Sequence, residues 1–222
     1  MEEVGTTLIC GPSEVTDTFV FEGALHWARE GRRVVYVTPV PLESLPPRYH
    51  ESVGFRGEHL GILQLIKFMY LPDYRSLADI LVDLDTFVAP PSVLFIDKLE
   101  NYTPNSGDAG PGSAELLIAK TCAVAMDTMK ACSRTLKRKV HLCATLPAEA
   151  LGKVHSIYFD NIWRCSIDET NPSDPEPEGK TIIFKKVTCA IDEQAFKFKS
   201  LRDGTIVLQE IFKELSQSFG DI

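Results

Sequence analysis

The sequence predicts an α/β protein with a parallel sheet covered by helices and with antiparallel hairpins towards the C-terminus. Up to about residue 146, short apolar runs alternate with segments of helical periodicity, which is typical of a parallel, helix-covered sheet. Beyond Pro147, short alternating runs are separated by turn residues, which is typical of hairpins. We expect one domain over residues 1–222, with a parallel part at about 6–146, a hairpin extension at about 156–208 and a C-terminal tail at 209–222.

The parallel part is expected to begin with a buried strand that ends at Gly11-Pro12, followed by a helix that Thr16 or Asp17 caps and Gly31 ends. The strands expected here are the apolar runs 6–10, 34–38, 63–70, 92–97 and 140–145. Two further helices are expected, one opening at Pro72-Asp73 and the longest over 113–136.

The C-terminal part is expected to contain strands joined by turns and then a short terminal helix. The expected strands are 156–167, 181–189, 194–201 and 205–208, and the expected helix is 211–219.

Composition excludes several classes of protein. The 23 Lys and Arg against 31 Asp and Glu give a net charge of −8, which argues against coating nucleic acid or anionic membrane by global charge. The six cysteines form no C-x-x-C pair, so a reducing compartment is expected, with neither a zinc site nor a disulfide framework. No apolar run approaches the ~20 residues that cross a bilayer, so no membrane association is expected.

The turn after the first strand has the register of a phosphate-binding loop but different chemistry. Against the pattern G-x-x-x-x-G-K-[ST], Gly11 and Thr18 are in place, whereas Thr16 replaces the second glycine and Asp17 replaces the lysine. Replacing Lys by Asp changes the local charge by two units where a polyanion would bind, so ordinary nucleotide binding is not expected. Asp97, at the end of an apolar strand, occupies the position of a Walker B carboxylate that holds Mg²⁺.

These features together resemble the RecA-type recombinase core. Segments 65–72, 77–81 and 91–102 more specifically resemble one small family, the ATPase-like partner of the SWIM-domain zinc-finger protein in the animal Shu complex. The resemblance implies a RecA-like P-loop core and a nuclear role in homologous recombination repair. It also implies that the chain binds its SWIM-domain partner and supports a strand-exchange recombinase on single-stranded DNA.

The chain departs from the ancestral ATPase pattern at three positions. The phosphate lysine is Asp17, Pro39-Val40-Pro41 stand where a catalytic Glu is expected, and Leu146-Pro147 stand where a sensor Gln is expected. We therefore expect no ATP hydrolysis by this chain alone, no catalytic residue and no cofactor. Two alternatives stay open, namely a Mg-ATP-dependent enzyme such as a DNA-stimulated ATPase active only with its partner, and a single-stranded DNA-binding protein.

Candidate DNA-binding residues form a cluster at the end of the longest helix, with one more cation near a later turn. They are Arg134, Lys137, Arg138, Lys139 and Lys153. Cations also favour the C-terminus of a helix, so a purely structural role is the alternative for the cluster. The loops 102–113 and 147–156, which correspond to the DNA loops of recombinases, contain few cations. Phe21 and Ala24 match the F-x-x-A peptide that recombinases recognise, but their place in a helix favours a role in the core.

Overall fold

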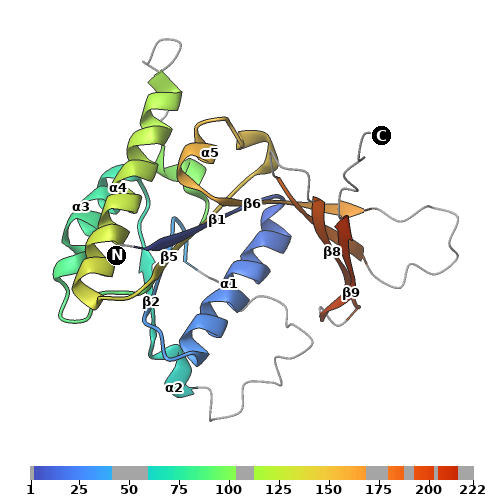
Figure 1. Ribbon diagram of the computed structural model, residues 1–222, viewed down its shortest axis with the longest axis horizontal. Helices are drawn as coiled ribbons and strands as arrows, with labels where there is room; N and C mark the ends of the chain where they lie inside the picture. The colour runs from blue at the N-terminus through green and yellow to red at the C-terminus, as the bar shows by residue number, and fades with distance from the viewer. Residues whose placement is uncertain are drawn as a thin grey trace, which may run out of the picture.

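A computed structural model of the chain describes residues 3–41, 60–103, 113–168, 180–187, 193–202 and 205–214. Within these ranges the protein is α/β with one mixed nine-stranded sheet (Figure 1), in the order β3-β2-β4-β5-β1-β6-β7-β8-β9. The strands are β1 Val4–Cys10, β2 Val34–Thr38, β3 Ile66–Tyr70, β4 Val93–Ile96, β5 Val140–Leu146, β6 Asn161–Asp168, β7 Lys180–Lys186, β8 Glu193–Ser200 and β9 Ile206–Glu214.

The sheet has a parallel half and an antiparallel half. The six strands β3, β2, β4, β5, β1 and β6 are neighbours in that order, and each pairs in parallel with the next. Strand β6 then begins an antiparallel series that runs through β7 and β8 to β9. The expected α/β architecture, with a parallel part extended along one edge by antiparallel hairpins, is confirmed at this level of description.

Helices cover both faces of the parallel half (Figure 1). They are α1 Ser13–Arg29, α2 Leu60–Leu63, α3 Tyr74–Asp83, α4 Ser113–Leu136 and α5 His155–Tyr158, with 3-10 turns η2 Leu84–Thr86, η3 Leu99–Tyr102 and η5 Ala148–Ala150. Because side chains alternate along a strand, Leu8 and Cys10 of β1 face the cluster formed with α3 and α4, while Ile9 faces α1.

Three apolar clusters hold the layers together. The largest joins the sheet to α3 and α4 and includes Leu81 and Met129, and the second joins α1 to the opposite face through Phe21 and Tyr36. The third lies under the hairpins and includes Phe184. The parallel half is therefore buried on both faces, which explains why its strands are nearly continuous apolar runs.

The predicted start of α1 is wrong. The helix begins at Ser13, and its N-cap residue is Pro12, which makes no side-chain cap bond. The fixed φ of proline suits this position, and the Pro12 carbonyl accepts hydrogen bonds from the amides of Val15 and Thr16, both at 3.0 Å. Thr16 and Asp17 are therefore inside the helix and do not cap it. By contrast, α3 begins where predicted, with Asp73 as its cap.

Three other boundaries differ from the sequence prediction. The expected strand 63–70 begins at Ile66, because a short helix precedes it, and the expected strand 156–167 begins only at Asn161, after α5. The expected terminal helix is wrong over residues 211–214, which continue β9; residues 215–219 lie outside the described part. Long-range pairing decides this segment, since Ile211 lies opposite Phe196 of β8.

Candidate functional site

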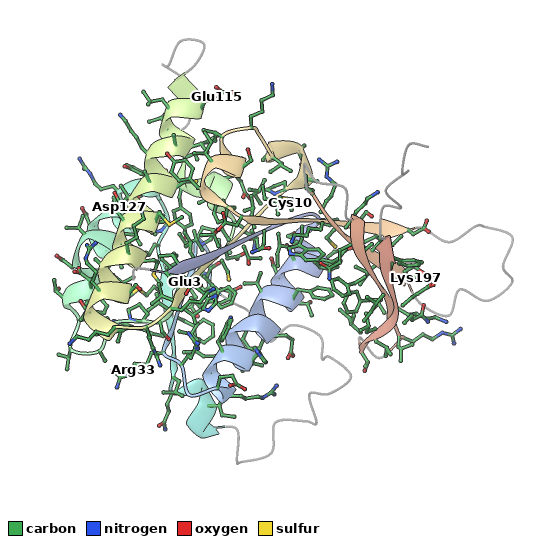
Figure 2. All side chains as sticks on the ribbon, viewed as in Figure 1. Glu3, Cys10, Arg33, Glu115, Asp127 and Lys197 are labelled. Atoms are coloured by element: carbon green, nitrogen blue, oxygen red, sulfur yellow. The ribbon has the colours of Figure 1, made fainter. Side chains whose placement is uncertain are left out.

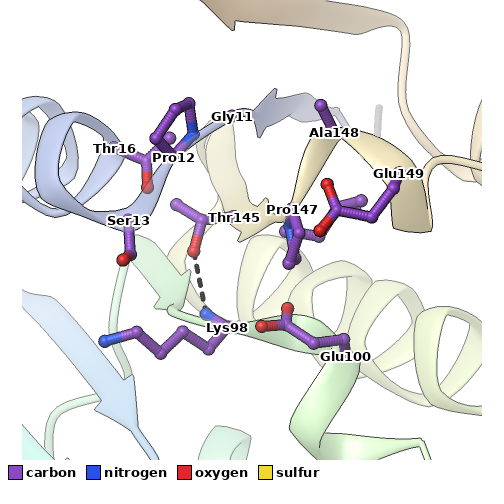
Figure 3. A pocket seen from close by; sticks show the side chains of 11 residues that line it. Gly11, Pro12, Ser13, Thr16, Lys98, Glu100, Thr145, Pro147, Ala148 and Glu149 are labelled. Atoms are coloured by element: carbon purple, nitrogen blue, oxygen red, sulfur yellow. Dashed lines mark hydrogen bonds between the residues drawn. The ribbon is translucent and has the colours of Figure 1, made fainter.

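A pocket lies at the carboxyl ends of β1, β4 and β5, where sequence analysis places the degenerate phosphate loop (Figure 3). Its volume is about 470 Å³. The residues that line it are Gly11, Pro12, Ser13, Thr16, Lys98, Glu100, Thr145, Leu146, Pro147, Ala148 and Glu149. In a parallel sheet covered by helices, this edge is where ligands are commonly bound.

The turn between β1 and α1 is too short to form a phosphate loop. The Gly11 amide donates to the Leu146 carbonyl at 3.0 Å, and α1 begins two residues later. A Cβ atom at Gly11 would lie 2.7 Å from the Cys165 carbonyl oxygen of β6. Gly11 is thus required by the close approach of two strands, which is a structural reason for glycine independent of phosphate.

Asp97 is held rigidly at the end of β4. It is 1% exposed, and each carboxylate oxygen accepts a hydrogen bond: Oδ1 from the Thr145 hydroxyl at 2.8 Å and Oδ2 from the Thr38 hydroxyl at 3.0 Å. These hydroxyls come from β5 and β2, the two neighbours of β4. Hydrogen bonds of this kind allow a carboxylate to stay charged when it is buried.

Lys98 turns back over this carboxylate. Its backbone adopts the left-handed conformation (φ 55°, ψ 56°), and its amide donates to the Thr145 hydroxyl at 2.8 Å. Its Nζ atom lies 3.3 Å from Asp17 Oδ2 and 3.6 Å from Asp97 Oδ2. One ammonium group therefore bridges the carboxylate in the phosphate-lysine position and the carboxylate in the Walker B position.

The surroundings of this cluster shift the pKa values of Asp17 and Lys98. Burial, followed by the nearby Asp97 charge, raises the pKa of Asp17 above its ordinary value, and Lys98 only partly offsets this. Burial by itself would lower the pKa of Lys98, but the carboxylates of Asp97 and Asp17 together raise it. The cluster thus stabilises the protonated lysine, and Lys98 is already paired before any ligand enters.

The rest of the pocket is acidic. Figure 3 shows the carboxylates of Glu100 and Glu149 on the same side of the pocket, while the Lys98 side chain extends away from them. Burial raises the pKa of Glu100, and the charges of Asp97 and Glu149 add to this effect. Among the described residues that line the pocket, Lys98 is the single cation. An anionic ligand would therefore meet two acidic side chains and a lysine whose charge is already neutralised.

The other predicted site residues are divided between the two ends of the sheet. Thr16 is buried and lines the pocket, whereas the hydroxyl of the buried Thr18 bonds back to the Glu14 carbonyl at 3.4 Å within α1. Lys153 is exposed between η5 and α5. The remaining DNA candidates lie at the opposite, amino edge of the sheet, and they are Arg134, Lys137, Arg138 and Lys139. Most of the expected DNA loop 102–113 lies outside the described residues.

Sequence reasoning missed the part played by Lys98, Thr38 and Thr145. The sequence does contain a signal for Lys98. The loop has Asp17 where a lysine is expected, and a lysine directly follows Asp97. The direction of the Lys98 side chain depends on its left-handed backbone, which no residue type at that position signals.

Two further expectations concern residues outside the pocket. Phe21 and Ala24 are 2% and 0% exposed, so the F-x-x-A match is part of the core. No three His, Cys, Asp or Glu residues of the described segments are grouped so that they could hold a metal ion. The cysteines that the structure describes are free, and burial raises the pKa of each of their thiols, to about 11 for Cys132 and to about 12 for the others.

No protein-family model matches this chain, and no curated protein matches it significantly. Within the described segments, no helix has both the length and the apolar character to cross a bilayer. The fold and the site geometry define the class of this protein. It is an α/β protein with a mixed sheet, and the pocket at the carboxyl edge of the sheet is acidic, with its lysine already paired to carboxylates of the same chain.

Proposed function

We propose that this chain is a non-catalytic, RecA-like subunit of a nuclear homologous-recombination complex. In this proposal it binds a SWIM-domain zinc-finger protein, and the pair supports a strand-exchange recombinase on single-stranded DNA. The single observation that carries the non-catalytic part is the contact of Lys98 with Asp17 at 3.3 Å.

This ion pair argues against use of the pocket for nucleotide. To meet a phosphate, Lys98 would have to leave Asp17, and the phosphate would then be close to Asp17 and to the buried Asp97. Each unit pair of like charges at ~4 Å costs roughly 4 kcal/mol at an effective dielectric of ~20. The direct entry from Pro12 into α1 also leaves no loop of free amides to surround a phosphate.

Sheet order supports descent from a P-loop core. The Gly11 turn and Asp97 lie at the same carboxyl edge, on β1 and β4, and a single strand, β5, lies between them. The positions expected for a catalytic Glu and a sensor Gln follow β2 and β5 at this same edge, where the chain has Pro39-Val40-Pro41 and Leu146-Pro147.

The segments that resemble the Shu-complex family form one structural unit. They contain β3, part of α3, and β4 with η3, and both β3 and β4 pair with β2. The Tyr102 hydroxyl donates to the Leu71 carbonyl at 2.9 Å and so joins two of these segments directly. A chain that no longer binds nucleotide but still binds a protein partner would be selected to keep a contiguous surface. The unit at the β3 edge is such a surface.

Two measurements test the proposal. Calorimetric titration of Mg-ATP into the chain, alone and with a SWIM-domain protein, is expected to give no binding in either state. The control is Asp97→Asn, which keeps the shape of the side chain but removes its charge. Tight binding that is lost in Asp97→Asn would instead favour the partner-dependent ATPase. Co-expression with the SWIM-domain protein is expected to yield a complex, and its absence would reject the partner assignment.

A further inference from the structure

The acidic side of the pocket at the carboxyl edge takes no part in the ion-paired cluster. Its walls carry Glu100, from η3, and Glu149, from η5. Among the described residues, no lysine, arginine or histidine forms an ion pair with either carboxylate. Lys98 is engaged elsewhere, with Asp17 and Asp97. Two carboxylates therefore face one cavity without a cation of their own.

Glu100 carries an acceptor that the described part of the fold does not satisfy. Its Oε2 atom is buried and accepts no hydrogen bond from any residue that the structure describes. A buried acceptor without a donor costs free energy, and a bound donor would remove that cost. Burial, with the charges of Asp97 and Glu149, also raises the pKa of this carboxyl. A cation between Glu100 and Glu149 would supply the missing donor and offset the repulsion of like charges.

A second free acceptor lies on the other side of the pocket. Thr16, in the first turn of α1, lines the pocket, yet only 2% of it is exposed. Its hydroxyl makes no hydrogen bond with another described residue, whereas the Thr18 hydroxyl of the same helix bonds back to the Glu14 carbonyl. Figure 3 shows the Thr16 oxygen turned into the space between Ser13 and Thr145. The pocket thus presents unpaired oxygen atoms from two sides, one of them on a side chain that is almost completely buried.

The arrangement of these acceptors indicates an organic cation. No three His, Cys, Asp or Glu residues of the described segments are grouped so that they could hold a metal ion. The acceptors lie on three separate elements, α1, η3 and η5, around a cavity of about 470 Å³, which is a usual size for a ligand pocket. An ammonium group has three donors around a point charge, whereas a guanidinium group has five in a planar fork and can reach acceptors on several walls. Guanidinium is also the more weakly hydrated of the two cations, so it enters a pocket at a lower cost.

The remaining walls of the pocket oppose a cation only weakly. The N-terminus of α1 is equivalent to roughly half a positive charge, which is less than the charge of the two carboxylates. Pro12 has no amide hydrogen, and its carbonyl already accepts from the amides of Val15 and Thr16. Pro12, Pro147 and Ala148 line the pocket and are at least partly exposed, so they offer apolar surface to the three-carbon stem of an arginine. These walls therefore accept an apolar stem that ends in a cation.

We propose that the pocket binds the guanidinium group of an arginine that another protein presents. Lys98, the single cation among the described residues that line the pocket, is paired with Asp17. The pocket therefore has no partner for the α-carboxylate of free arginine, whereas an arginine within a polypeptide has no such carboxylate.

This inference goes beyond the proposed function and does not depend on the SWIM-domain protein. Failure to form the complex with that protein would leave the arginine pocket intact. Conversely, failure of the pocket to bind arginine would leave the recombination role intact.

The test is an NMR titration of the isotope-labelled 222-residue chain with the blocked tripeptide acetyl-Gly-Arg-Gly-amide. The amide signals of Thr16, Glu100 and Glu149 are expected to shift and to saturate. The same peptide with citrulline in place of arginine keeps the shape but lacks the charge, and it is expected to bind at least about tenfold more weakly. Free arginine is expected to bind more weakly than the blocked peptide, because its carboxylate enters an acidic pocket.

A double variant locates the binding. Glu100→Gln/Glu149→Gln is expected to weaken peptide binding at least about tenfold, since it removes both carboxylates. The matched control, Glu30→Gln/Asp127→Asn, removes the same charge at two exposed positions and is expected to bind like the wild type. Figure 2 shows Asp127 on one side of the molecule, well away from Cys10, which is the last residue of β1 before the pocket.

A single substitution separates binding from folding. Thr16→Val keeps the shape of the side chain, and the hydroxyl it removes has no partner among the described residues, so thermal stability should not fall. Peptide binding should nevertheless weaken about threefold. No binding of the arginine peptide, equal binding of the citrulline peptide, or an equal loss in the control variant would overturn the proposal. Tighter binding of free arginine than of the peptide would reject a protein partner in favour of the amino acid.

Discussion

Removal of the Lys98 charge tests the ion-paired site most directly. We choose Lys98→Met, because methionine is also unbranched, keeps most of the length of the side chain and removes only its charged end. At 3.3 Å and 3.6 Å, the gross attraction of the ammonium to Asp17 and Asp97 is about 5 kcal/mol each at an effective dielectric of ~20. The cost of burying the ammonium opposes most of this attraction.

The net loss in the free energy of unfolding depends on the carboxylates that the substitution leaves without their cation. Removing one member of a buried pair typically costs about 3–5 kcal/mol, since it leaves an uncompensated charge. Lys98 is 25% exposed and Asp97 keeps two hydroxyl donors, so we expect the lower end, about 3 kcal/mol, at pH 7. Urea denaturation measures this loss. The control Lys130→Met breaks an exposed pair with Asp127 and should cost less than about 1 kcal/mol.

The pH dependence of this variant has a defined sign. Asp17 already has a raised pKa, and loss of the lysine raises it further, because Asp97 then acts on it without compensation. A folded-state pKa above the unfolded one means that the native state binds more protons, so stability rises as pH falls through the folded pKa. The destabilisation by Lys98→Met should therefore shrink between pH 7 and pH 5. A loss below about 0.5 kcal/mol at pH 7, with wild-type pH dependence, would refute the account of the site.

Three further predictions concern single positions. Gly11→Ala should cost about 1–3 kcal/mol in urea denaturation, because its Cβ would lie 2.7 Å from the Cys165 carbonyl; Gly61→Ala, with open space around it, should not destabilise, and equal losses would contradict this. Asp73→Ala should cost about 0.5–2 kcal/mol and Asp73→Asn much less, whereas equal losses would exclude the cap of α3. Asp17→Ala should be more stable than Asp17→Asn by up to about 0.7 kcal/mol, as expected inside a helix, and an N-cap role would give the reverse order in thermal unfolding.

The sequence predicts the positions of the site better than its interactions. The register of Gly11 after a strand and of Asp97 at the end of another follows from local apolar patterns, and both prove to lie at one sheet edge. The start of α1 could not be predicted in this way, because Pro12 and the polar residues after it are all compatible with a helix end.

Long-range contacts account for the other differences. The Arg32 guanidinium donates to the Lys139 carbonyl across 107 positions of sequence, so this contact is present only in the folded chain. Residues 211–214 contain helix-compatible residues, yet the ladder with β8 makes them a strand. In each of these cases the local preference is weak, and pairing with a distant strand or segment decides the outcome.

Helix α1 contributes to two of the apolar clusters at once. Phe21 packs beneath the parallel half, while Phe19 lies with its ring centroid 4.2 Å from that of Phe184 and 5.0 Å from that of Phe198, both on the hairpins. The apolar side chains of the hairpins therefore pack against the same helix that covers the parallel half. Because one helix supports both halves of the sheet, we expect the two halves to exchange their most protected amide hydrogens in one cooperative opening.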